Sequence, residues 1–179
     1  VSGSVSPITA AQIEHACARG FEPIVLDARL VVHEHWLAAE VQRVTALGRE
    51  AIARGRDPLV FTATGPDDPR VAAFREAVRT SGTPIAAVND RLGAALGDIL
   101  NALVRQCGLR RVVISGGDTS SHAASRLGID ALTAIAPLSP GVPLCRAHSP
   151  DPAIDGLEIA LKGGQTGAPD FFTAVRDKH

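Results

Sequence analysis

The stretch VVISGGDTSSHAASRLGI, residues 112–129, carries the pattern that decides the fold. It begins with a short apolar run, passes through two glycines and a polar turn, and continues with helical periodicity. A buried strand that leads directly into a helix is typical of sheets that helices cover on both faces. The stretch therefore predicts a strand over 111–117 and a helix over 119–127.

The same alternation continues along the whole chain. Further strands are expected at 23–28, 58–64, 131–138 and 156–164, and helices at 8–19, 32–54, 69–80, 86–107 and in a last segment, DFFTAVRD. Continuous apolar strands that alternate with helices predict an α/β fold, a three-layer α/β/α arrangement with a mostly parallel sheet. We see no internal repeat and no linker, so residues 1–179 are expected to form one domain.

Composition excludes several classes of function. The net charge is -1 and aromatic residues make up 3%, which argues against nucleic acid as a partner. No apolar run approaches the roughly 20 residues that span a membrane. Three widely spaced cysteines and the absence of a signal peptide predict reduced thiols and a cytoplasmic location. A start at VSGS, with no methionine anywhere, is expected of a piece of a longer protein.

Four loops combine glycine with hydroxyl groups or lysine at predicted strand ends. They are residues 3–6, 62–66, 115–120 and 162–167. In parallel α/β sheets, ligands bind at the carboxyl ends of the strands, where glycine and helix-opening N–H groups suit an anion. Any one loop alone is more simply a tight turn, and neither GxxxxGK[ST] nor GxGxxG is present in its required context. Together the loops predict a phosphate-binding cradle.

Several polar residues have a simpler interpretation beside a functional one. Asp118 is either a helix cap or a residue that holds Mg²⁺ or accepts a proton, and Lys162 is the best cation for a phosphate. His122 is as readily a surface residue as a phosphate contact. The remaining candidates are assigned structural roles: a solvated face for His33-Glu34-His35, a turn and helix cap for Asp67-Asp68, and core packing for Phe171 and Phe172.

Four segments together carry a resemblance to a known family. They are GSVSPITAAQ (3–12), VVISGGDTSSHAASRLGI (112–129), PLSPGVPLCRA (137–147) and EIALKGGQTGAPDFF (158–172). In this order they resemble the C-terminal nucleotide-binding half of the four-carbon acid sugar kinases, long catalogued as a domain of unknown function. The resemblance spans nearly the whole chain.

The resemblance implies an ATP-binding domain that works with Mg²⁺. A separate N-terminal domain, absent from this chain, would bind a sugar acid such as threonate, erythronate or 3-oxo-tetronate, whose terminal hydroxyl receives the γ-phosphate of ATP. The partners are then ATP or ADP and the sugar acid, and a homodimer is left open. The fragment alone is expected to bind nucleotide weakly and to turn over nothing.

The resemblance also implies the site residues. Asp118 would be the catalytic base or a Mg²⁺ ligand. Relatives read K-S-G-N-x-G in the last loop, where this chain has KGGQTG at 162–167, so a side-chain contact there is in doubt while the backbone roles are expected to survive. The residues implied in nucleotide binding are Ser4, Ser6, Ser115, Gly116, Gly117, Asp118, Thr119, Ser120, Lys162, Gly163, Gly164 and Gly167.

Two other classes of function stay open on the sequence. The GGD turn at 116–118, followed by hydroxyl groups, also resembles the phosphate loop of phosphofructokinase, which leaves another sugar-phosphate kinase or a sugar-phosphate isomerase. A non-catalytic module that senses a nucleotide or a sugar phosphate is the other alternative.

Overall fold

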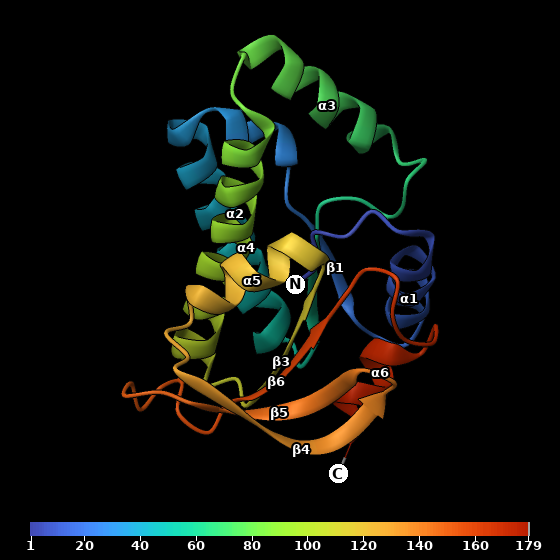
Figure 1. Cartoon of the computed structure of the whole chain (residues 1–179), viewed down its shortest axis with the longest axis vertical. Helices are drawn as coiled ribbons and strands as arrows, with labels where there is room; N and C mark the ends of the chain where they lie inside the picture. The colour runs from blue at the N-terminus through green and yellow to red at the C-terminus, as the bar shows by residue number, and fades with distance from the viewer. Residues whose placement is uncertain (179) are drawn as a thin grey trace.

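The computed structural model describes residues 1–178, with the side chains of residues 118–120 outside the described part. Strands and helices alternate along the chain (Figure 1). The elements are α1 (Pro7–Ala18), β1 (Glu22–Val25), the 3₁₀ helix η1 (Ala28–Val32), α2 (Glu34–Ala53), β2 (Pro58–Phe61), α3 (Pro69–Ser81), α4 (Ile85–Cys107), β3 (Arg111–Ser115), α5 (Gly117–Ser125), β4 (Ala131–Ser139), β5 (Val142–His148), β6 (Glu158–Lys162) and α6 (Phe171–Arg176).

The sheet is parallel through most of its width. β1 pairs with β2 and β3 pairs with β6, both in parallel. Ser2 forms parallel bridges to Phe61 of β2 and to Ser115 of β3, so the first residues of the chain join the two pairs. We expected residues 3–6 to be a loop and assigned no strand before it. That assignment was incomplete because so short a segment, VSG, carries no periodicity of its own.

An antiparallel hairpin closes the other side of the sheet. β5 pairs with β6 and with β4, both antiparallel, which gives the order β3-β6-β5-β4. β5 was not predicted from the sequence, because Pro143 and Arg146 interrupt its apolar run. Gly141, with a φ of 75°, makes the tight turn between the two strands.

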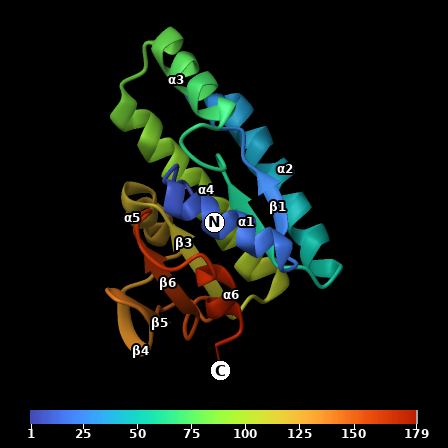
Figure 2. The ribbon, with the colours of Figure 1, turned by 90° about the vertical axis from the view of Figure 1, so that its right-hand side faces the viewer.

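Helices cover both faces of the sheet, as predicted. Figures 1 and 2 show α2, α4 and α5 on one face and α1 with α6 on the other. One apolar cluster joins α2 and α4 to the sheet, and a second joins α1 and α6 to it. Phe171 and Phe172 of α6 are each 3% exposed, which confirms their predicted place in the core. The three-layer α/β/α prediction is confirmed.

The second half of α5 packs closely on α4. A Cβ atom added to Gly97 of α4 would lie 2.9 Å from the Cα of Ala123, and one added to Gly93 would lie 2.6 Å from the Cβ of His122. Glycine at both positions lets the two backbones approach closely. This contact fixes α5 against α4 on one face of the sheet.

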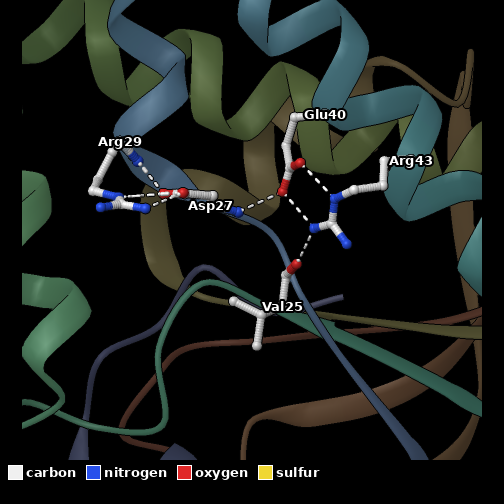
Figure 3. A network of polar contacts seen from close by, with 5 residues as sticks. All are labelled: Val25, Asp27, Arg29, Glu40 and Arg43. Carbon is white, nitrogen blue, oxygen red and sulfur yellow. Dashed lines mark hydrogen bonds and ion pairs between the residues drawn. The ribbon is translucent and has the colours of Figure 1, made fainter.

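A buried carboxylate ties the carboxyl end of β1 to α2 (Figure 3). Glu40, 5% exposed, accepts a 2.8 Å hydrogen bond from the Asp27 backbone N–H and two from Arg43, whose guanidinium also donates to the carbonyl of Val25 at 2.8 Å. The hydrogen bonds from Arg43 hold the pKa of Glu40 below its usual value. These bonds hold the backbone at Val25 and Asp27 against α2 and so fix the path of the chain after β1.

The helix expected at 32–54 is present as α2, and it starts two residues later than predicted. η1 ends at Val32, and α2 starts only at Glu34. His33, Glu34 and His35 are exposed, as predicted for a solvated face, and Glu34 pairs with Arg91 at 3.2 Å. Within the described residues, no cluster of three or more His, Cys, Asp or Glu side chains could hold a metal ion, and no helix could cross a membrane.

Candidate active site at the carboxyl edge of the sheet

The loops predicted to bind phosphate follow neighbouring parallel strands. Residues 3–6 continue the first residues of the chain, and 62–66, 115–117 and 162–167 continue β2, β3 and β6. Gly3 donates its N–H to the carbonyl of Ser115 at 3.0 Å, and Gly116 donates to that of Lys162 at 3.0 Å. The structure therefore brings the loops at 3–6, 115–117 and 162–167 side by side at one edge.

A cavity of about 350 Å³ opens above this edge, and we call it the α3–α4 cavity. Its floor is formed by Gly3–Val5, Thr62–Ala63 and Gly116–Gly117, and its walls by residues of α3 and α4 and by Ala28. The wall residues are Arg70, Val71, Phe74, Arg75, Asn89 and Leu92. The described lining residues include two arginines and no carboxylate; Arg70 pairs with Asp68 at 2.8 Å, whereas Arg75 forms no ion pair within the described part of the chain. The positive charge of Arg75 therefore makes the cavity suited to an anion.

A smaller cavity of about 220 Å³ lies on the other side of the same glycine turn. Gly116 and Gly117 line both cavities, and the smaller one is completed by Ser121, Leu161, Lys162 and Gly163. The glycine pair thus separates two hollows at the strand ends, and an extended ligand could cross it.

The turn between β3 and α5 requires glycine at its first position. Gly116 is buried and has a φ of 128°, a conformation that side chains of L-residues rarely adopt. As the cap residue of α5 it offers no side chain to the first turn of the helix. Backbone N–H groups at the start of a helix that are not capped by a side chain are available to an anion.

Three side chains at the start of α1, two in the helix and one at its N-cap, fasten the last loop (162–167) and the residue after it to the helix. The hydroxyls of Ser6 and Thr9 both donate to the carbonyl of Gly164, at 2.8 Å for Thr9. The Nε2 of Gln12 donates to the carbonyls of Thr166 and Ala168, both at 3.0 Å. This loop is therefore held at the start of α1 by hydrogen bonds that reach across the whole sequence.

The start of α1 reveals two residues that we did not predict in the site. Ser6 caps the helix: its Oγ accepts from the backbone N–H of Thr9 at 3.1 Å. Thr9 and Gln12 were missed as supports of the last loop. Their spacing of three residues, on one face of a helix that starts after Ser6-Pro7, was the available signal.

Ser4 packs directly against the last loop. It is 9% exposed, and its Oγ accepts from the Ser6 N–H at 3.2 Å. A Cβ atom at Gly164 would overlap the Ser4 hydroxyl and lie 3.2 Å from the Ser4 Cβ, whereas one at Gly163 would meet only the Thr166 hydroxyl, at 3.4 Å. The first and last loops therefore fit together only with glycine at 164.

Lys162 is buried beneath the last loop and does not project into open solvent. Its side chain is 2% exposed, and its ammonium donates to the carbonyl of Gly163 at 2.9 Å and to the Thr9 hydroxyl at 3.4 Å. Among the described side chains no carboxylate pairs with it, and burial lowers its pKa to about 8. A buried cation without a carboxylate partner makes the electrostatic potential at the neighbouring loops more positive, which favours an anion there.

The other predicted residues divide into three groups. Ser115 is fully buried at the end of β3, and its hydroxyl has no hydrogen-bond partner among the described atoms. Gly167 makes a turn with a φ of 92°, where a Cβ would lie 2.8 Å from the Phe171 ring. The side chains of Asp118, Thr119 and Ser120 lie outside the described part, so their predicted roles stay predictions. The wall residues Arg70, Arg75, Phe74 and Asn89 were not predicted, because nothing in their local sequence separates them from surface helix residues.

Two polar residues take the roles that the sequence favoured or left open. Asp68 caps α3 and accepts hydrogen bonds from Thr64 and Arg70; burial raises its pKa, but these bonds outweigh burial and lower it to about 2. The prediction of a turn and cap is confirmed for Asp68. The Nε2 of His122 lies 3.1 Å from the Oδ1 of Asp90 on an exposed part of α4 and α5, and His122 does not line either cavity.

The fold and these loops define a class: an α/β domain with a cavity at the carboxyl edge of a parallel sheet, the edge where ligands bind in such folds. Residues 1–172 match the family model of the nucleotide-binding C-terminal domain. The chain belongs to this family, the C-terminal nucleotide-binding domain of the four-carbon acid sugar kinases, as the sequence resemblance predicted.

Similar proteins with assigned activities are sugar-acid kinases. The chain is 45% identical over 177 residues to a 3-oxo-isoapionate kinase of Paraburkholderia graminis, covering 99% of the chain and 38% of that protein. It is 33% identical over 180 residues to a 3-oxo-tetronate kinase of Methylobacterium radiotolerans, again covering 99% of the chain and 38% of the relative. The chain thus spans less than two fifths of the length of these relatives.

Solved structures share the fold. A Haemophilus influenzae protein of the family DUF1537 superposes with a TM-score of 0.76 at 23% identity, over 99% of this chain and 39% of that one. A DUF1537 domain from Bordetella bronchiseptica, crystallised with citrate as a domain-swapped dimer, gives 0.72 at 20% identity, over 99% and 40%. At these identities the likeness supports the α/β architecture.

The fit between the first and last loops predicts unequal effects of one substitution at adjacent glycines. Gly164→Ala should lower the free energy of unfolding by about 1–3 kcal/mol, because the new methyl group must displace Ser4. Gly163→Ala, the matched control, should change it by less than about 0.5 kcal/mol. Urea unfolding at pH 7 measures both, and equal losses would contradict the close fit.

The buried ammonium of Lys162 predicts a pH dependence of stability. Because its pKa falls from 10.5 to about 8 on folding, only the unfolded chain binds this proton between those values, so stability should rise with pH across that interval. Relative to Lys162→Met, the native chain should gain on the order of 3 kcal/mol between pH 8 and 10.5. Burial raises the pKa of the Cys17 and Cys145 thiols, but these cysteines are common to both proteins. Urea unfolding at several pH values measures the difference. If the free energy of unfolding changed equally with pH in the native chain and in Lys162→Met, the lowered pKa of Lys162 would be contradicted.

Proposed function

We propose that this chain is the ATP-binding half of a sugar-acid kinase and that its nucleotide site is the carboxyl edge described above. The observation that carries the proposal is the α3–α4 cavity, in which two glycine-containing loops and Thr62–Ala63 meet two arginines with no carboxylate among the described lining residues. Kinase activity of relatives at 45% and 33% identity supports the same conclusion.

The phosphates would be held chiefly by backbone groups. In the proposal they lie across Gly116–Gly117, where the N–H groups that open α5 point at an anion. Ser4 and the 163–164 loop would bound them on the other side. Lys162 would contribute its charge from below the loop, and Arg75, which forms no ion pair within the described part of the chain, could reach the ligand from α3.

Ser6, Ser115 and Gly167 take supporting roles in this proposal. The Ser6 hydroxyl is occupied by the cap of α1 and by the carbonyl of Gly164, so it shapes the loop. Gly167 makes the turn that lets Gln12 reach the loop backbone. The Ser115 hydroxyl, buried without a partner among the described atoms, lies at the strand end next to Lys162, its register partner on β6.

Bound ATP would supply the phosphoryl group, and its Mg²⁺ would offset the charge of the phosphates. Asp118, at the start of α5, would hold the metal ion or accept the proton of the sugar-acid hydroxyl. The γ-phosphorus would form a bond to the hydroxyl oxygen as its bond to the β,γ-bridging oxygen breaks.

The acceptor would be a sugar acid delivered by a further domain. Both relatives named above act on 3-oxo acids, and this chain covers 38% of each, so the acceptor site would lie in the remaining part of such a protein. 3-Oxo-tetronate, 3-oxo-isoapionate, threonate and erythronate are the substrates to compare, with fructose 6-phosphate as the discriminating alternative. The 179-residue chain would turn over none of them, and a cytoplasmic location stays a prediction.

Nucleotide binding by the chain itself tests the site. Calorimetry with MgADP and MgATP should give a dissociation constant of about 1 mM or tighter. Gly164→Ala should weaken binding at least about tenfold by displacing Ser4, and Gly163→Ala should leave it within about twofold. A null result with the native chain at millimolar nucleotide would overturn the proposed site.

A test of the proposed role of Asp118 requires the longer protein that contains the acceptor domain. Asp118→Ala should lower kcat at least about 100-fold, as expected for loss of a general base, without unfolding the protein. Asp130→Ala removes an exposed carboxylate beyond the end of α5 and should leave kcat unchanged. Steady-state kinetics with saturating substrates decide the matter, since retained turnover in the Asp118 variant would remove this residue from the chemistry.

A further inference from the structure

A groove lies at the end of the sheet opposite to the candidate site, between the first residues of β2 and those of β3. Its volume is about 560 Å³. Leu100, Leu103 and Leu109 line one face, and Phe21, Phe172 and Val175 line the other. The floor is formed by the backbone segments 58–60 and 111–113, and Val1 lies at its inner end.

The first residues of the chain already occupy the continuation of this groove. The Ser2 N–H donates to the carbonyl of Val60 at 2.8 Å, and the Val1 nitrogen donates to that of Val113 at 2.8 Å. Val1 thus lies between β2 and β3 as a strand residue does, near the middle of the molecule (Figures 1 and 2).

The two backbone segments that form the floor present hydrogen-bonding groups in strand register. Alternate residues of a strand face the same neighbour, and Leu59 and Phe61 face β1. The carbonyl of Pro58 and the N–H of Val60 therefore face the groove. On β3, by the same alternation, the carbonyl of Arg111 and the N–H of Val113 face it. The described part of the chain provides no backbone partner for these four groups.

The amino group of Val1, at the inner end of the groove, is buried in surroundings that disfavour its charged form. Val1 is 9% exposed, and burial lowers the pKa of its amino group from 8.0 to about 5. The acids at the rim are already paired, Glu158 with Arg111 at 2.6 Å and Asp57 with Arg176 at 3.8 Å, and Arg110 adds positive charge. A peptide N–H in the same place would make the bond to Val113 without a charge to bury.

We propose that this groove binds an extended apolar segment, parallel to β2 and β3 and covalently continuous with Val1, which completes a central strand of the sheet. The occupant is the segment that precedes this domain in the longer proteins, of which the chain covers 38%. The residue before Val1 donates to Pro58 and accepts from Val60. The residue before that one donates to Arg111 and accepts from Val113.

The same strand leads directly to the candidate site. Val1 and Ser2 are followed by Gly3 and Ser4, and Ser4 packs on Gly164. A segment held in the groove restrains the position of Ser4. A displacement of that segment should therefore change how Ser4 packs on the last loop. This consequence for ligand binding rests on the proposed function, but occupancy of the groove does not.

Three N-terminal extensions of the 179-residue chain test the proposal without any ligand. The first places Gly-Ser-Ile-Val before Val1. The second, Gly-Ser-Ile-Pro, cannot donate to Pro58, and the third, Gly-Ser-Gly-Ser, has no apolar side chain for either face. The Ile-Val extension should raise the midpoint of thermal unfolding by about 5 °C or more over the Gly-Ser-Gly-Ser chain, and the proline chain should lose most of this gain.

Two further measurements separate a filled groove from the mere removal of a buried charge. The unextended chain should gain stability from pH 5 to 8, because only its unfolded state binds the Val1 proton there, and every extension should remove that part of the slope. Amide exchange at Val60 and Val113 should slow at least about tenfold only with Ile-Val. Equal midpoints of thermal unfolding in all three extended chains would overturn the proposal. Protection of the Val60 and Val113 amides that depends on protein concentration would also overturn it, because it would show that the strand is exchanged between copies.

Discussion

The parallel pairing of residues 1–3 with β2 and β3 is the interaction on which the rest of the structure depends. Without it, the β1–β2 pair and the β3-β6-β5-β4 sheet would share no strand-to-strand hydrogen bond in the part of the chain that the structure describes. The Ser2 and Gly3 N–H groups close that gap, at 2.8 Å to Val60 and 3.0 Å to Ser115. The same residues then lead into Ser4, so the segment that unites the sheet also begins the candidate site.

Around this joint, the site is assembled from segments far apart in sequence. α1 holds the last loop through Ser6, Thr9 and Gln12, while α4 holds α5 through the close approach at Gly97. Two helices on opposite faces of the sheet thus fix the two sides of the glycine cradle independently. Lys162 adds a buried charge between them, at a cost in folding free energy that an anion in the cradle would reduce.

Much of the fold could be predicted, because periodicity and glycine turns are local properties. Alternating strands and helices predict the three layers, and the rule for strand ends predicts where the loops gather. Other features depend on distant residues. The residues 1–3 become a strand only because β2 and β3 lie on either side, and β5 is stabilised by pairing with β6 despite Pro143. Arg75 and Asn89 join the cavity wall through the placement of whole helices, which no local pattern encodes.

The departures of the last loop from the K-S-G-N-x-G pattern of the family that it resembles fall where the structure tolerates them. Gly163, where that pattern has serine, is exposed, and a Cβ there would meet only the Thr166 hydroxyl at 3.4 Å. Gln165, where the pattern has asparagine, is also exposed. The glycines whose added Cβ would collide with Ser4 or with Phe171, at 164 and 167, are retained. The loop therefore keeps the backbone shape that a cradle of N–H and carbonyl groups requires, and its variation is confined to side chains that face solvent.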